Sequence, residues 1–73
     1  MKMYEPMRGL DGRWYVRQIT DGAVFLRTMG GRYATLYEAE AYACEASGFD
    51  PEHEMLRYRV ARREYKRRIK EGK

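Results

Sequence analysis

Only one cysteine, Cys44, and one histidine, His53, occur among the 73 residues. One cysteine cannot form a disulfide within the chain, and together with a single histidine it cannot supply the four ligands of a structural zinc site. We therefore expect neither a disulfide nor a metal, and no pattern in the sequence points to another cofactor. This composition suits a reducing compartment.

Long apolar stretches are lacking as well. No segment approaches the roughly 20 apolar residues of a membrane-spanning helix, and residues 1–6 lack the apolar run of a signal peptide. We expect a protein without a membrane segment, located in the cytoplasm.

Enzyme signatures are the third absence. The chain has no G-x-S-x-G motif, no phosphate-binding loop and no metal-spaced cluster. A chain of this length buries only about 60% of the surface that its unfolded form exposes, so a deep catalytic cleft would use up its core. We predict a single domain, residues 1–73, that is not an enzyme. We interpret Glu38, Glu40 and Glu45 as a solvated helix face.

Charged residues are abundant and unevenly placed. Residues 62–73 hold seven Lys or Arg and two Glu, a net charge of +5, whereas residues 1–61 hold eight positive and nine negative side chains, a net charge of −1. The net charge of +4 is therefore a property of the C-terminal segment.

Three glycine-containing turns divide the first half of the chain. Asp11-Gly12, Asp21-Gly22 and Gly30-Gly31 each offer the positive φ that two-residue hairpin loops require. Aromatic and β-branched residues lie between them. The spacing predicts an antiparallel meander of three strands within about residues 13–35: residues 14–19, 23–29 and 32–35. Residues 3–7 could add a fourth strand. Because Pro6 cannot donate a hydrogen bond to a ladder, such a strand would lie at the sheet edge.

Two helices are predicted after the sheet, which makes the fold α+β. Thr35 and Glu38 have the spacing of a capping box, so the first helix should begin at Leu36 and run over about residues 36–47, where Ser47-Gly48 ends it. Asp50-Pro51 predicts a second helix over about residues 51–69, with a flexible tail at residues 70–73.

The expected strand register sorts the side chains onto two faces. If the inner turns have two residues, Tyr15 pairs with Thr28 and Thr28 with Tyr33, and a glycine bulge would change these pairs. One face then holds Tyr15, Arg17, Ile19, Val24, Leu26, Thr28 and Tyr33, which we expect to form the core. The other holds Trp14, Val16, Gln18, Phe25, Arg27, Met29, Arg32 and Ala34. The alternative is that this second face is the core, or that the second helix covers it.

Two surfaces could bind a partner. Aromatic and arginine side chains are typical of interface hot spots, and the second sheet face offers Trp14, Val16, Phe25, Arg27 and Arg32. The basic helix fits phosphates or an acidic protein surface through Arg62, Arg63, Lys66, Arg67 and Arg68. The alternative for this helix is a solvated cationic end without a partner.

Part of the chain resembles a group of DNA-binding domains. Residues 12–17 (GRWYVR), Val24-Phe25 and residues 35–43 (TLYEAEAYA) resemble the three-strand-plus-helix pattern of integrase arm-binding and AP2-type domains. This resemblance implies a sheet face that enters the DNA major groove. It covers about 30 residues, and the strongest charge of the chain lies after it.

In size and overall character, the chain is also similar to the small proteins by which lytic phages inhibit host RNA polymerase, of the Xanthomonas phage type. That resemblance rests on no motif and assigns no residue. It implies binding to the N-terminal region of the polymerase β′ subunit, inhibition of transcription initiation and a possible antitermination effect. We therefore expect a monomeric, non-enzymatic regulator of polymerase. The alternatives are a DNA- or RNA-binding module and an inhibitor of a bacterial defence nuclease.

Overall fold

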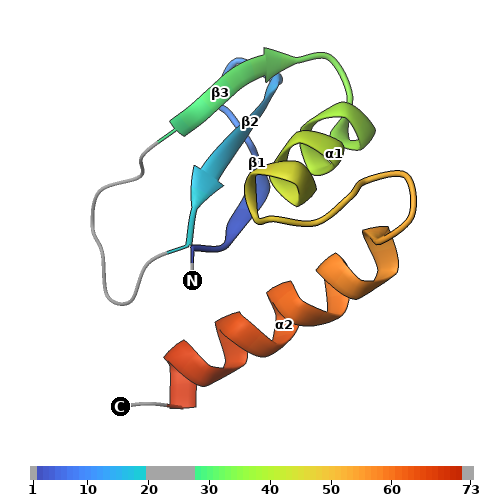
Figure 1. Cartoon of the computed structure of the whole chain (residues 1–73). Helices are drawn as coiled ribbons and strands as arrows, with labels where there is room; N and C mark the ends of the chain where they lie inside the picture. Colours follow the sequence, from blue (N-terminus) through green and yellow to red (C-terminus); the bar gives the residue numbers. More distant parts are fainter. Residues whose placement is uncertain (1, 20–27, 72–73) are drawn as a thin grey trace.

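A computed structural model describes residues 2–19 and 28–71. Strands β1 (Tyr4–Arg8), β2 (Trp14–Gln18) and β3 (Thr28–Tyr33) form an antiparallel sheet in the order β1-β2-β3. Helix α1 (Leu36–Ala46) packs on this sheet, and helix α2 (Met55–Glu71) passes it on the β1 side (Figure 1). The predicted α+β class is confirmed. Within the described ranges, neither helix has the length and hydropathy that crossing a bilayer requires.

The first hairpin forms at the expected glycine turn. Gly12 adopts φ +80°, and the Asp11 carboxylate accepts a 3.0 Å hydrogen bond from the Arg13 amide. The strand before this turn is β1, which lies at the sheet edge as Pro6 requires. The Tyr4 amide, which β1 leaves unpaired, donates a 2.9 Å hydrogen bond to Ser47 Oγ at the end of α1. The C-cap residue of α1 thus covers part of the exposed sheet edge.

The prediction of a turn at Gly30-Gly31 was wrong, because both glycines lie within β3. Thr28 pairs with Arg17 rather than with Tyr15, and it shares a strand with Tyr33 rather than pairing with it. Two irregularities in the β2–β3 ladder explain the difference. At one of them Arg32 is the extra residue, and it adopts φ 64°. The Asp21-Gly22 turn and most of the strand predicted at residues 23–29 lie outside the described residues.

The predicted core face was wrong along β2 but right for Ile19 and Tyr33, which are buried in the core or pack against it. Val16 is completely buried, and the neighbouring Trp14 and Tyr33 pack against the core. The opposite side of the β1–β2 hairpin is polar, because Arg17 lies opposite Glu5 and binds it. The sequence alternative that places Trp14 and Val16 inside is therefore correct. Together with the buried Ile19, the core consists of Met3, Tyr4, Val16, Ala39, Ala43, Cys44 and Tyr58.

Helix α1 has the caps that the sequence predicts. The Glu38 amide donates a 3.2 Å hydrogen bond to the Thr35 hydroxyl, and this hydroxyl lies 3.4 Å from the Glu38 carboxylate. At the other end, Gly48 adopts φ +94°, and the amides of Gly48 and Phe49 donate to carbonyls of the last turn. This is a Schellman ending, which directs Phe49 back onto the core.

Helix α2 begins at Met55, four residues later than predicted. The side chain of Asp50 still organises its start, but it caps a turn at residues 51–53. It accepts hydrogen bonds from the Glu52 amide at 3.0 Å and from His53 Nδ1 at 2.7 Å. The hydrogen bond to Asp50 raises the pKa of His53 above its ordinary value. The helix runs to Glu71, beyond the predicted end at residue 69.

Candidate interaction surface

The buried side chain of Tyr58 anchors α2 to the rest of the protein. Its hydroxyl donates a 2.6 Å hydrogen bond to the Tyr4 carbonyl oxygen and accepts one of 3.2 Å from Arg62. The Arg62 guanidinium also lies 5.0 Å from the centre of the Tyr58 ring. Because Tyr4 belongs to the edge strand, α2 protects backbone that another strand would otherwise pair with.

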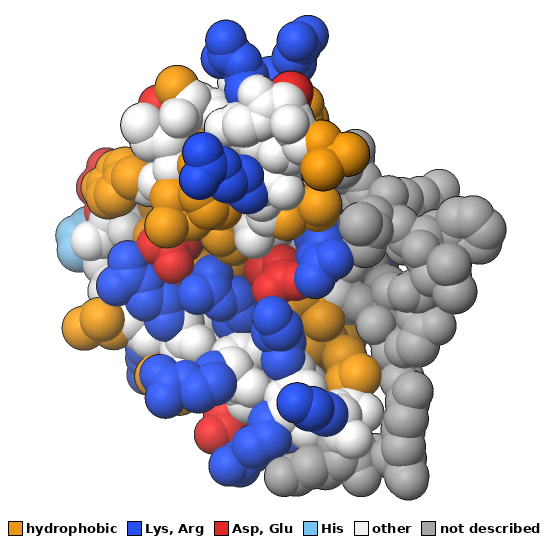
Figure 2. Space-filling view, turned by 180° about the vertical axis from the view of Figure 1, so that it is seen from behind, with side chains coloured by type: hydrophobic (Ala, Val, Ile, Leu, Met, Phe, Trp, Pro, Cys, Tyr) orange, Lys and Arg blue, Asp and Glu red, His pale blue; other side chains and the backbone are white. Residues whose placement is uncertain are grey.

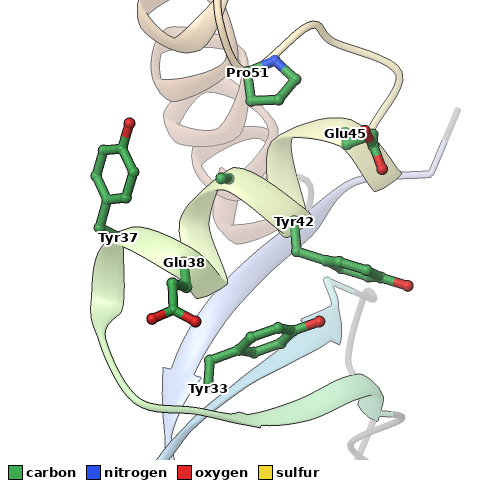
Figure 3. Close-up of a pocket in the computed structure, with 7 residues that line it drawn as sticks. Tyr33, Tyr37, Glu38, Tyr42, Glu45 and Pro51 are labelled. Carbon is green, nitrogen blue, oxygen red and sulfur yellow. The ribbon is translucent and has the colours of Figure 1, made fainter.

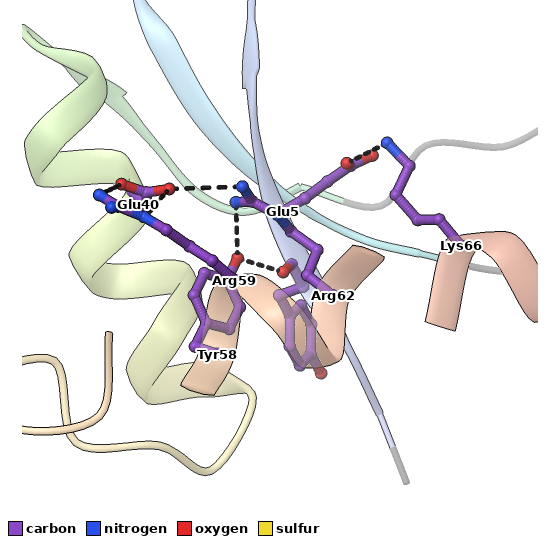
Figure 4. A network of polar contacts seen from close by, with 7 residues as sticks. Glu5, Glu40, Tyr58, Arg59, Arg62 and Lys66 are labelled. Atoms are coloured by element: carbon purple, nitrogen blue, oxygen red, sulfur yellow. Dashed lines mark hydrogen bonds and ion pairs between the residues drawn. The ribbon is translucent and has the colours of Figure 1, made fainter. Parts of the chain in front are cut away.

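Glu40 of α1 is buried between two arginines of α2 (Figure 4). Arg59 binds its carboxylate in bidentate fashion at 3.2 and 2.8 Å, and Arg62 approaches it to 3.4 Å. The hydrogen bonds from Arg59 outweigh burial and hold the pKa of Glu40 below its usual value. The prediction that Glu40 belongs to a solvated helix face was therefore wrong, whereas Glu38 and Glu45 are exposed.

Glu5 of β1 is the second buried acid of this network. It accepts a 2.7 Å hydrogen bond from Arg17 Nε and one of 2.8 Å from Lys66 Nζ. Burial alone would raise the pKa of Glu5, but the hydrogen bonds from Lys66 and Arg17 outweigh it, so that the pKa is lowered. In the described part of the chain, every buried side-chain nitrogen and oxygen has a hydrogen-bond partner.

The side of α2 that faces away from the sheet carries a different set of residues. We call it the outer stripe. The spacing i, i+4, i+7, i+11, i+14 places its members on one face. The first two are apolar and exposed, Leu56 at 74% and Val60 at 53%. The other three are Arg63, Arg67 and Lys70, and they too are exposed. The outer stripe thus combines an apolar pair with a row of cations.

Helix α2 gives one side of the molecule a strongly positive surface. Its 17 residues include eight Lys or Arg and two Glu, a net charge of +6. In the view of Figure 2, cationic side chains gather over the lower half of the surface, where α2 lies, with acidic atoms visible between them. The contacts of Glu5 and Glu40 lower this charge only in part.

The structure divides the predicted basic residues between two roles. Arg62 and Lys66 bind the buried acids, and Arg67 pairs with the exposed Glu64 at 3.3 Å. Arg63 and Arg68 are exposed. The predicted helix surface is thus brought together, but two of its five residues hold α2 in place.

The structure does not bring the predicted sheet surface together. Val16 is inaccessible to a partner, and Trp14 is half-buried against the core. Arg32 is exposed on β3. Phe25 and Arg27 lie outside the described residues, so their predicted role stays a prediction.

Sequence reasoning missed the apolar half of the outer stripe. Apolar residues of an amphipathic helix usually face the core, so this rule gives no reason to place Leu56 and Val60 on an exposed surface. Their spacing of four residues was the available signal for a separate face. The structure shows instead that Tyr58, Ala61, Tyr65 and Ile69 pack against the core.

The remaining side chains of chemical interest lie apart from one another. Cys44 is buried, and burial raises the pKa of its thiol, so the reactive thiolate is disfavoured. His53 is exposed at the turn before α2 and binds only Asp50 among the described residues. Within the described ranges, no group of three or more His, Cys, Asp or Glu side chains is placed to hold a metal ion.

Comparison of the chain with models of protein families, with curated proteins and with solved structures found no match.

Proposed function

We propose that this protein is a non-enzymatic regulator that binds bacterial RNA polymerase and inhibits transcription initiation. The proposed target is the N-terminal region of the β′ subunit, as in the phage inhibitors that the chain resembles, and the proposed setting is a monomer in the bacterial cytoplasm. The observation that carries the proposal is the outer stripe, in which exposed Leu56 and Val60 lie in line with Arg63 and Lys70.

The apolar pair favours a protein partner over a nucleic acid. A phosphate backbone binds cations, but it offers no apolar surface that would cover Leu56 and Val60. A protein surface with an apolar depression and an acidic rim can bind both halves of the outer stripe, the apolar pair in the depression and the cations at the rim. An amphipathic helix docked in this way is a common mode of protein recognition.

The two halves of the stripe would act at different steps. The cations attract an acidic surface over a distance and raise the association rate, and salt screens this effect. The apolar pair loses water on contact and slows dissociation. Inhibition then follows from occlusion: the bound protein covers a polymerase surface that initiation needs. Antitermination would require the complex to persist during elongation.

A capture experiment tests the identity of the partner. The tagged protein is incubated with a bacterial lysate, and the retained proteins are identified by mass spectrometry. We expect polymerase subunits, and binding should be reproduced with purified polymerase. Recovery without any polymerase subunit, together with no binding to the purified enzyme, would contradict the proposal.

Substitution of the apolar pair tests the surface. We expect Leu56→Ser with Val60→Ser to weaken binding to purified polymerase at least about tenfold, because each buried aliphatic side chain contributes roughly 1 kcal/mol or more. Leu10→Ser is the matched control, because Leu10 is fully exposed in the β1–β2 turn. Equal losses in both proteins would exclude a specific role for the outer stripe.

Direct DNA or RNA binding is the second candidate, and the net charge of +6 on α2 favours it. Four or five phosphate contacts would give a log–log salt slope of roughly −4 for duplex DNA. We expect only non-specific affinity for DNA, no tighter than roughly 10⁻⁴ to 10⁻⁶ M near physiological salt. Tight, sequence-dependent binding in a fluorescence anisotropy titration would instead support the second candidate.

A further inference from the structure

An open groove of about 350 Å³ lies along the exposed side of α1, with β3 at one edge (Figure 3). Its volume is near the lower end of the roughly 300–1,000 Å³ range of ligand pockets. Tyr37, Ala41 and Tyr42 line it from the helix, Tyr33 from β3 and Pro51 from the segment before α2. Two glutamates complete the lining, Glu38 and Glu45.

Aromatic faces are the main feature of this groove. The rings of Tyr33 and Tyr42 lie 5.7 Å apart, with 39° between their planes. Tyr37 stands on the preceding turn of α1 and is 75% exposed. Ala41, whose side chain is small, also lines the groove. Such a wall of tyrosines attracts a cation through the negative faces of the rings.

The charge around the groove has the opposite sign to that of α2. Residues 33–54 contain six Asp or Glu and neither Lys nor Arg. Glu40 is buried beneath α2, but Glu38 and Glu45 line the groove and Asp50 is exposed beside Pro51. An acidic, aromatic groove therefore lies on a protein whose net charge is +4.

We propose that the groove formed by Tyr33, Tyr42, Glu38 and Glu45 binds an arginine-containing segment of a partner protein. A guanidinium group stacks on a tyrosine face and presents a planar set of donors to a carboxylate, which matches both features of the lining. The net charge of +6 on α2 repels the same segment from that side of the protein. This site is independent of the outer stripe of α2.

The spacing of the two glutamates suggests the form of the segment. Residues seven apart on a helix are about 10 Å apart along its axis, so Glu38 and Glu45 flank Tyr42 at that separation. In a polyproline II segment, which has three residues per turn, residues three apart lie on the same side of the chain and about 9 Å apart. A segment with two arginines three residues apart can therefore reach both carboxylates.

The test uses a fluorescein-labelled peptide, Gly-Arg-Ser-Gly-Arg-Gly, and fluorescence anisotropy at low salt. The same peptide with citrulline in place of both arginines keeps the shape and removes the charge. We expect binding of the arginine peptide and at least about tenfold weaker binding of the citrulline peptide. No binding of the arginine peptide at millimolar concentrations would overturn the proposal.

Matched variants locate the binding site. Glu45→Gln should weaken arginine-peptide binding several-fold, whereas Glu64→Gln, which removes the same charge from an exposed position of α2, should not. Ala41→Leu should weaken binding by filling the groove without changing the charge, and a preserved thermal unfolding midpoint would show that the variants remain folded. Equal effects of Glu45→Gln and Glu64→Gln would overturn the proposal.

Sedimentation of the free protein tests the competing occupant. The cationic α2 of a second copy could approach the same groove. An increase of mass with concentration that Glu45→Gln abolishes would assign the groove to a second copy and overturn the proposal. A constant monomeric mass would support a separate partner.

Discussion

At the scale of single residues, the Tyr58 hydroxyl joins helix α2 to the edge strand of the sheet. It connects α2 to the backbone of β1 and to Arg62. Its position could not be predicted, because an apolar stripe of a helix does not show which tyrosine will meet an unpaired carbonyl group of an edge strand.

Tyr58→Phe should lower the free energy of unfolding by about 1–3 kcal/mol, because the Tyr4 carbonyl loses its partner within the protein. Tyr37→Phe is the control, since Tyr37 is mostly exposed. Urea unfolding followed by fluorescence measures both. A Tyr58→Phe protein as stable as the control would show that the hydrogen bond contributes little.

Two valines test whether Val16 belongs to the core. Val16→Ala should reduce the free energy of unfolding by roughly 2 kcal/mol, because it removes buried methyl groups and leaves a cavity. Val60→Ala, on the outer stripe, should change it by less than about 0.5 kcal/mol. The opposite order in thermal or urea unfolding would mean that Val16 is not in the core.

At the scale of elements, the sequence predicted those parts whose signals are local. The caps of α1 use residues three to five positions apart, and they form as expected. The pairing of β2 with β3 was not predictable in the same way. A glycine pair can form a turn or lie in a strand beside a bulge. Gly30 and Gly31 lie in β3 beside a bulge, because they pair with β2. The two bulges also change which side chains share a face.

The contact between α1 and α2 should depend on pH through Glu40. Its pKa is lowered in the folded protein, so the stabilisation is present above the unfolded value near 4.5 and is lost as pH falls through the folded value. Glu40→Gln should therefore be less stable than the natural protein at pH 7, and the difference should shrink toward pH 3. Urea unfolding at both pH values measures it. A difference that does not change with pH would contradict an ionised Glu40.

At the scale of the whole molecule, charge separates two sides of the protein. The segment of residues 33–54 carries only acidic charges, and α2 carries a net charge of +6. The sequence predicted the basic helix from composition alone. It could not predict that Glu5 and Glu40 would hold Arg59, Arg62 and Lys66 in place, because these partners are 19 or more residues apart. The exposure of the apolar half of the outer stripe depends on which side of α2 packs on the core, and the sequence does not show that side.

The central claim is that the outer stripe of α2 is the docking surface, and a pair of charge variants tests it most directly. Arg63→Gln with Lys70→Gln removes two exposed cations of the stripe. Arg8→Gln with Arg13→Gln removes two exposed cations from the β1–β2 hairpin. Association with purified RNA polymerase is measured by surface plasmon resonance at two salt concentrations. We expect the helix variant to associate about tenfold more slowly at low salt and the hairpin variant to associate like the natural protein. Equal association of both variants would contradict the claim.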